Sequence, residues 1–139
     1  MIRPRYLLDT NTVSYIIRGK PPAVRARLKG IPFRQLAISA ITEAELLYGV
    51  ERETEAVRLN SLIQDFLFQV DSLAWDSNAA RTYGMMRSEL ARGGRILGNH
   101  DMLITAQAIA ENLILVSNDD AFRQVPRLSL EDWTKPLTE

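Results

Sequence analysis

The acidic residues of this chain stand where a carboxylate can do chemistry. Asp9 ends the apolar run 6–8, and Asp119 follows the apolar run 113–116 after a Ser-Asn pair. Glu45 and Asp101 fall in the first turns of two predicted helices. Carboxylates within a few ångström of one another repel and raise each other's pKa unless a cation lies among them. A hard divalent ion is therefore the expected occupant, and Mg²⁺ or Mn²⁺ suits such oxygen ligands.

Each of these acids also has an ordinary structural explanation. Asp9 can cap a helix, Asp101 can pair with a helix dipole, Glu45 can be a solvated helix residue and Asp119 can form a turn. Their joint placement is what favours a metal site. Zinc is disfavoured, because the chain has no cysteine and a single histidine. That residue, His100, is predicted to lie outside the site, because neighbours at a helix start point in different directions.

The elements that must position these acids alternate along the chain. Apolar runs predict strands, the last of them around 128–130, and segments with helical spacing lie between the runs. Such alternation predicts an α/β fold with three α/β/α layers around a central, mainly parallel, twisted sheet. The carboxyl ends of its strands meet at one edge, where open α/β sheets bind their ligands. The four acids are expected to converge there.

Length and composition indicate one domain that covers residues 1–139. The lack of cysteine fits a reducing compartment. No apolar run approaches the roughly 20 residues of a membrane span, and the start lacks the apolar stretch of a signal peptide. We therefore expect a cytoplasmic protein with no membrane partner.

Charge is balanced overall but unevenly distributed. Seventeen basic residues equal seventeen acidic ones, yet residues 1–35 hold eight basic residues against the single acid Asp9. Arginine, the commoner basic residue here, suits bidentate phosphate contact. The segment is predicted to contact nucleic-acid phosphates, and an acidic partner surface is an equally open alternative. The candidate contacts are Arg18, Lys20, Arg25 and Arg27.

Four segments together resemble the ordered signature of the PIN-domain ribonucleases, and within them the VapC toxins of bacterial toxin–antitoxin pairs. They are Leu-Asp-Thr-Asn at 8–11, Ile-Thr-Glu-Ala-Glu-Leu-Leu-Tyr-Gly-Val at 41–50, Gly-Asn-His-Asp-Met-Leu-Ile at 98–104 and Leu-Val-Ser-Asn-Asp at 115–119. The likeness covers nearly the whole chain. Each motif is weak alone, but their order and spacing together are specific.

The resemblance implies a metal-dependent endoribonuclease with Asp9, Glu45, Asp101 and Asp119 as the catalytic acids. Asp9 and Asp101 would bind Mg²⁺ or Mn²⁺, while Asn11 and Ser117 would hold the carboxylates in place. The family motif selects Glu45 over Glu43, and Asp120 competes with Asp119 for the last place. The resemblance also implies structured RNA such as a tRNA as substrate, a VapB-like antitoxin, a homodimer and higher assemblies with the antitoxin.

Two other functions compete with this one. A non-catalytic PIN-like module would bind RNA or a protein partner without cutting, although it would have no reason to keep four mutually repelling acids. A phosphatase of haloacid-dehalogenase-like build also sets aspartates at strand ends. It would want a second aspartate two residues after the first, and position 11 is asparagine. Trp75 and Trp133 could stack on bases, but isolated tryptophans are more often core residues.

Overall fold

The computed structural model describes residues 3–52 and 57–136. Five parallel strands form one sheet in the order β3-β2-β1-β4-β5. The strands are β1 (Tyr6–Leu8), β2 (Leu36–Ser39), β3 (Asp71–Leu73), β4 (Ile114–Val116) and β5 (Leu130–Glu131). The helices are α1 (Thr10–Arg18), α2 (Pro22–Leu28), α3 (Ala40–Arg52), α4 (Val57–Gln69), α5 (Ser77–Arg92) and α6 (Asn99–Ala110), with short 3₁₀ turns η1 (Phe33–Gln35) and η2 (Asp120–Gln124).

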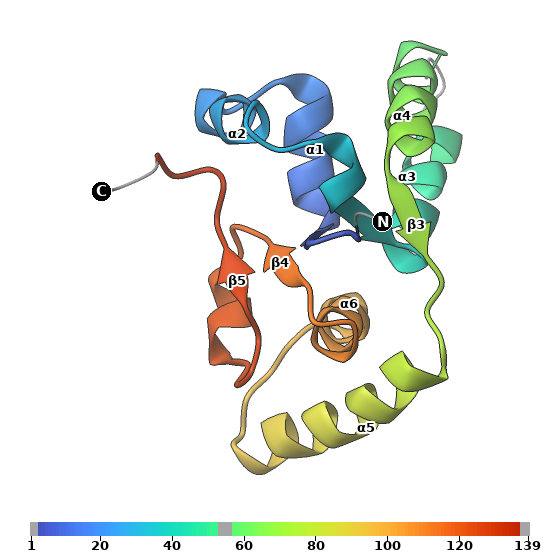
Figure 1. The fold of residues 1–139 in the computed structure, drawn as a ribbon. Helices are drawn as coiled ribbons and strands as arrows, with labels where there is room; N and C mark the ends of the chain where they lie inside the picture. Colours follow the sequence, from blue (N-terminus) through green and yellow to red (C-terminus); the bar gives the residue numbers. More distant parts are fainter. Residues whose placement is uncertain (1–2, 53–56, 137–139) are drawn as a thin grey trace.

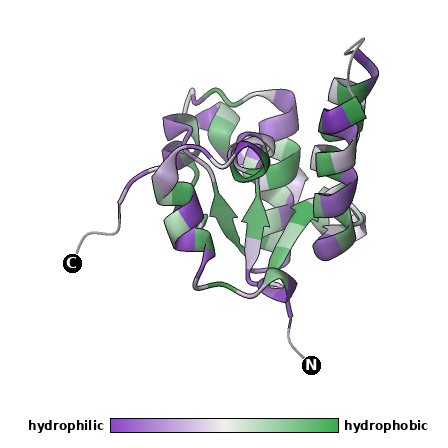
Figure 2. Cartoon of the chain, turned by 90° about the horizontal axis from the view of Figure 1, so that it is seen from above, coloured by the Kyte–Doolittle hydropathy of each residue, from purple (hydrophilic) through white to green (hydrophobic). Residues whose placement is uncertain are grey.

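Helices cover both faces of this sheet, which confirms the predicted three-layer α/β/α fold. Successive strand residues point to opposite faces. Leu7 therefore packs with α5 and α6, while Tyr6 and Leu8 pack with α1, α2 and α4 on the other side (Figure 1). Figure 2 shows the apolar strands at the centre, with polar residues on the outer surfaces of the helices. No helix in the described part of the chain is both long and apolar enough to cross a membrane.

The three adjacent strands β2, β1 and β4 form the edge of the sheet at which the site lies. β1 lies between β2 and β4, and Leu7 and Leu8 are fully buried. β2 and β4 end beside β1, so the residues after all three strands share one edge of the sheet. The backbone N–H of Asp9 donates to the carbonyl of Val116 (3.1 Å), which extends the pairing of β1 with β4 to the first acid.

The last strand lies later than predicted. We expected a strand around 128–130, whereas β5 comprises Leu130 and Glu131. Arg127 has a positive φ of 69°, a turn conformation that ends extended structure. The carbonyl of Ser129 accepts the first ladder bond, from the N–H of Leu115 (2.9 Å). Pairing therefore begins only after this turn.

Both tryptophans are structural, as expected. Trp133 is 3 % exposed and makes an edge contact with Tyr6, with 5.3 Å between ring centroids. The indole N–H of Trp75 donates to the carbonyl of Leu103 (2.8 Å), and its ring packs edge-on against Tyr83.

Candidate active site

Asp9 joins the central strand to the first helix. It follows β1 and is the N-cap of α1, where its Oδ1 accepts a hydrogen bond from the Thr12 N–H (2.8 Å). The Thr12 hydroxyl donates to the carbonyl of Val116 (3.0 Å), so the cap is also tied to β4. Asp9 is only 6 % exposed. Its position is thus set by two strands and a helix, and little freedom remains to its carboxylate.

Glu45 lies one turn deeper in its helix than predicted. We expected Glu45 in the first turn of its helix, but α3 begins at Ala40, directly after β2. The Ser39 hydroxyl oxygen accepts from the Ile41 N–H (3.0 Å) and so satisfies one of the free donors of the helix start. This cap allows the helix to begin without a connecting loop and moves Glu45 to the second turn.

Glu45 and Glu43 point to different places. The Thr10 hydroxyl, at the start of α1, donates to Oε1 of Glu45 (2.7 Å). Glu43 instead accepts from the hydroxyl of Ser72 on β3 (2.8 Å). Of the two glutamates, only Glu45 therefore contacts Thr10, the residue directly after Asp9. This agrees with the family motif, which selects Glu45 over Glu43.

Asp101 occupies the first turn of α6, as predicted. The cap of that helix is Gly98 rather than Asn99, which is its first residue, and the cap makes no side-chain hydrogen bond. A Cβ at position 98 would lie 3.2 Å from Oδ2 of Asp101. The glycine therefore leaves room for this carboxylate beside the helix start.

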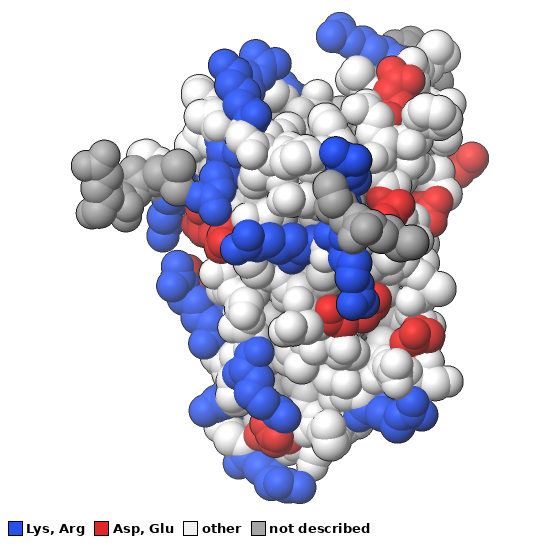
Figure 3. Space-filling model, in the orientation of Figure 1, with Lys and Arg blue, Asp and Glu red and all other residues white. Residues whose placement is uncertain are grey.

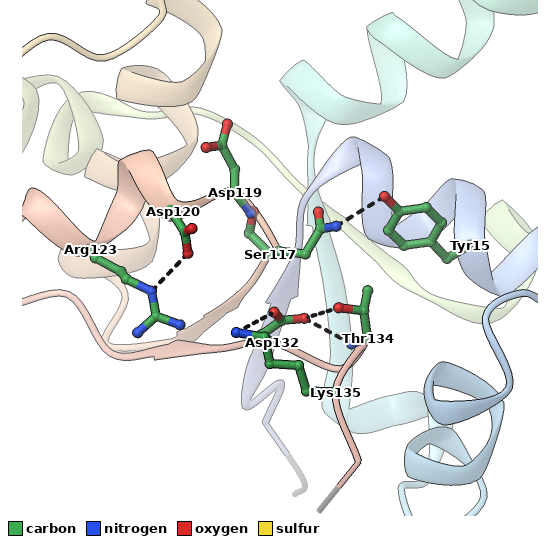
Figure 4. A network of polar contacts seen from close by, with 9 residues as sticks. Tyr15, Ser117, Asp119, Asp120, Arg123, Asp132, Thr134 and Lys135 are labelled. Carbon is green, nitrogen blue, oxygen red and sulfur yellow. Dashed lines mark hydrogen bonds and ion pairs between the residues drawn. The ribbon is translucent and has the colours of Figure 1, made fainter.

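Asp119 and Asp120 have separate roles. Asp119 caps η2 by accepting from the Ala121 N–H (2.9 Å), and its own N–H donates to the Ser117 hydroxyl (3.1 Å). Asp120 pairs with Arg123 (3.0 Å) at the surface, and Figure 4 shows Asp119 pointing away from that pair. The arrangement favours Asp119 as the fourth acid.

Burial raises the pKa of Asp9 above its ordinary value. Hydrogen bonds from Ser117 and Thr12 act in the opposite direction and lower it, while the negative charge of Asp119 adds a smaller rise. For the charged form of the Asp9 carboxyl group, burial therefore outweighs the hydrogen bonds that stabilise it.

The pKa of Asp101 is raised first by burial and then by the negative charges of Asp119, Asp9 and Glu45. His100 lowers it slightly. Asp101 is therefore the point at which the fields of all four acids meet. The convergence of all four acids in one metal site at this edge of the sheet stays a prediction.

The four acids fit a divalent cation by their chemistry, although they do not form a closed ligand shell. In residues 3–52 and 57–136, no three His, Asp or Glu side chains gather closely enough to hold one ion. Within the same ranges, no Lys or Arg forms an ion pair with any of the four. The donors are all carboxylate oxygens, which suit Mg²⁺ or Mn²⁺. When no cation is bound, the negative charges of these carboxylates repel one another, which is sufficient to keep them apart.

Comparison with known proteins identifies the family. Residues 6–128 match the family described as PIN domain. The chain belongs to the PIN domain family. It is 34 % identical over 130 residues to the tRNA(fMet)-specific endonuclease VapC of Salmonella typhimurium, covering 93 % of this chain and 98 % of that one. It is 37 % identical over 132 residues to ribonuclease VapC2 of Rickettsia felis, covering 94 % and 98 %. The chain is thus a PIN domain of the VapC type.

Solved structures agree with this assignment. The DNA-bound VapBC of Salmonella typhimurium matches with a TM-score of 0.86 and 34 % identity, covering 94 % of this chain and 98 % of that one. VapBC2 of Rickettsia felis, bound to a promoter fragment, matches with a TM-score of 0.84 and 36 % identity, covering 92 % and 98 %. The fold of this PIN domain therefore matches toxins crystallised with their antitoxins.

Two threonines at the start of α1 contact acids of this PIN domain, Thr10 through its hydroxyl and Thr12 through its backbone N–H, and neither contact was predicted from the sequence. Asn11, predicted to position the carboxylates, is exposed and makes no side-chain hydrogen bond within the described residues. Its neighbours Thr10 and Thr12 make those contacts. The sequence Thr-Asn-Thr at 10–12 indicated that polar side chains follow Asp9. Which of these three side chains faces the site depends on the exact residue at which the helix begins.

His100, which was predicted to lie outside the site, contacts one of the acids. Its Nδ1 lies 3.1 Å from Oε2 of Glu45, across two helices. Ser117, by contrast, lies where predicted: it is 1 % exposed and contacts both Asp9 and Asp119.

The candidate RNA contacts of the PIN domain are not equivalent. Arg27 is paired with Glu131 (2.6 Å) and lies over the Trp133 ring, so it joins α2 to the end of the sheet. Arg18, Lys20 and Arg25 are exposed. On the face drawn in Figure 3, Lys and Arg form separate groups rather than one continuous patch. Three of the four predicted contacts are therefore available to a phosphate, and Arg27 is engaged elsewhere.

Proposed function

We propose that this chain is a metal-dependent endoribonuclease toxin that cleaves RNA by attack of water on a phosphodiester. The observation that carries the proposal is the field at Asp101: burial and then the charges of three further carboxylates raise its pKa, and no Lys or Arg of the described residues pairs with any of the four. The names of the relatives, ribonuclease and endonuclease, support the same reaction.

Each acid has a distinct proposed task. Asp9 and Asp101 would bind Mg²⁺ or Mn²⁺, with Glu45 and Asp119 completing the negative site. When bound, such an ion supplies Lewis acidity, which makes water more acidic and neutralises charge on phosphate oxygens. The protein's own part is to keep the carboxylates oriented through the Thr12 N–H and the hydroxyl groups around them.

The RNA would approach over the edge of the sheet, past Arg18, Lys20 and Arg25. These long cations suit a phosphate backbone, which is contacted without regard to sequence. Because one relative is named as specific for tRNA(fMet), we propose a structured RNA such as a tRNA as substrate. Such a substrate would place the protein in the cytoplasm.

An antitoxin is the proposed protein partner. The matched structures from Salmonella and Rickettsia are VapBC complexes. This chain also exposes large apolar side chains, with Phe68 at 93 % and Tyr48 at 65 %, which is typical of a surface that another protein covers. A VapB-like antitoxin, a homodimer of this chain and a larger assembly of the two would each make use of such a surface.

Cleavage by the purified chain tests the proposal directly. The chain is incubated with total tRNA and Mg²⁺, and Asp9→Asn and Asp101→Asn serve as the inactive variants. Each substitution is expected to lower cleavage on the order of 100-fold or more, because a preorganised charge is lost at the reacting phosphate. Expression of the parent, and not of the variants, should arrest growth. RNA binding without cleavage by the parent would favour the non-catalytic module instead.

A further inference from the structure

Both carboxylate oxygens of Glu45 have a partner, and the two partners come from different helices. The Thr10 hydroxyl donates to Oε1 (2.7 Å), and Nδ1 of His100 lies 3.1 Å from Oε2. Thr10 directly follows Asp9, and His100 directly precedes Asp101. Glu45 is therefore connected through its two oxygens to the neighbours of two other acids.

The Glu45 carboxylate determines which nitrogen of the His100 ring carries a proton. A carboxylate accepts hydrogen bonds and donates none, so Nδ1 of His100 must carry the proton of this contact. A neutral ring with its proton on Nδ1 satisfies the contact as well as an imidazolium does. The contact thus needs a donor at the Nδ1 position and does not depend on the charge of the ring.

Holding Glu45 has a physical purpose. Its charge contributes to the raised pKa of Asp101, so the two carboxylates repel one another. A glutamate side chain has several rotatable bonds, and without contacts this one would turn away into solvent. Because the side chains of His100 and Glu45 are 62 % and 32 % exposed, their contact adds little to global stability. Its effect is therefore orientation.

We propose that His100 is a positioning residue that fixes Oε2 of Glu45 through an Nδ1–H donor, while Thr10 fixes Oε1. This rests on the proposed ribonuclease function, since it assigns the contact a role in that reaction. His100 itself need not touch the substrate. The pairing of a hydroxyl and an imidazole across one carboxylate keeps Glu45 directed toward the other acids.

The tautomer can be observed without any activity. The chain has one histidine, so a ¹⁵N-labelled sample without a histidine tag shows a single ring in its spectrum. In EDTA, at a pH where the ring is neutral, we expect the proton on Nδ1 in the parent. In Glu45→Ala the proton should shift toward Nε2, the usual site in free imidazole side chains. A parent ring protonated only on Nε2 would overturn the proposal.

Substitutions at position 100 then separate hydrogen bonding from charge. His100→Ala should lower kcat roughly 10- to 100-fold, as loss of an orienting partner does, with KM and the melting temperature unchanged. His100→Asn should restore most of the rate, because its amide nitrogen occupies the place of Nδ1. His100→Gln, whose amide reaches the place of Nε2, should not. Asn99→Ala, at the neighbouring exposed position, is the matched control and should behave as the parent.

The possible failures are distinguishable. If His100→Ala cleaves as well as the parent, or if His100→Asn is as slow as His100→Ala, the positioning role is wrong. If the parent cleaves no RNA while its ring is protonated on Nδ1 and responds to Glu45→Ala, the contact exists and the ribonuclease function has failed.

Discussion

At the scale of single residues, the acids of the site oppose folding as long as no cation is bound. Burial and mutual repulsion raise the pKa values of Asp9 and Asp101. The folded protein therefore favours their protonated forms more than the unfolded chain does. Function and stability make opposite demands on these residues, as is common where a site must concentrate charge.

The pH dependence of stability follows from the direction of these shifts. The stability contributed by a carboxyl group with a raised pKa is fully present below its ordinary value of 3.8 and is lost as the pH rises through the folded value. In EDTA, the parent should therefore lose stability relative to Asp9→Asn as the pH rises above 3.8. Asparagine keeps the oxygen that accepts from Thr12, so the helix cap survives.

Thermal melts across this pH range measure the difference between the two proteins. Asp120→Asn is the control, because its carboxylate is exposed and pairs with Arg123 outside the site. A gap between parent and Asp9→Asn that stays constant with pH would show that Asp9 is not the source of the effect.

At the scale of elements, the strands were easier to predict than the orientation of the side chains that follow them. The apolar runs of β1, β2 and β4 identify buried strands, and their polar ends identify the functional edge. The orientation of side chains at a helix start is less accessible. Each one-residue change in where a helix begins turns its side chains by about 100°. The family resemblance implied the role of Asn11, whereas the contacts at this helix start come from Thr10 and Thr12.

Capping explains the other differences. Ser39 reads as the end of an apolar strand, yet its hydroxyl starts α3 and moves Glu45 to the second turn. His100 was excluded because neighbours on one helix point apart, but its partner is Glu45 on another helix. Local periodicity cannot report a contact between residues 55 positions apart. The family resemblance supplied the four acids and Ser117, but not Thr10 or His100.

Arg27 provides a prediction at the scale of elements. Its pair with Glu131 joins α2 to β5, and both side chains are largely buried, at 25 % and 30 % exposed. Arg27→Ala should lower the free energy of unfolding by about 1 to 3 kcal/mol, because a hydrogen-bonded charge is lost and Glu131 loses its partner. Chemical denaturation measures the change. Arg25→Ala, an exposed residue of the same helix, should leave stability nearly unaltered, and equal losses in both variants would contradict the assignment.

At the scale of the whole molecule, a bound ion should turn the repulsion of the site into stability. Mg²⁺ or Mn²⁺ that binds only the folded state increases the free energy of unfolding by mass action, by about 2.7 kcal/mol at an ion concentration of 100 times the dissociation constant. The melting temperature rises accordingly. Differential scanning fluorimetry over an ion titration measures this rise, and excess EDTA should stop cleavage. In Asp101→Asn the rise should be greatly reduced. Full cleavage in excess EDTA would indicate a ribonuclease that needs no metal.

The basic amino-terminal segment is tested by salt. In an Asp9→Asn background, neutralising Arg18, Lys20 and Arg25 should weaken RNA binding for every sequence and flatten its salt dependence, since fewer counterions are released. Arg27 is omitted, because its loss would disturb the fold. Binding is measured at two salt concentrations. Arg81→Ala, at an exposed position of α5 on the other face of the sheet, is the matched control. An unchanged salt slope, with weakened antitoxin binding, would assign the segment to the protein partner.

The order in which the four acids occur along the chain bears on its synthesis. They span residues 9 to 119 of 139, and β4, which lies directly beside β1, begins only at Ile114. A growing polypeptide that still lacks this strand has neither its central pairing nor Asp119. A ribonuclease built in this way cannot bring its four acids together until residues 114–119 have been translated.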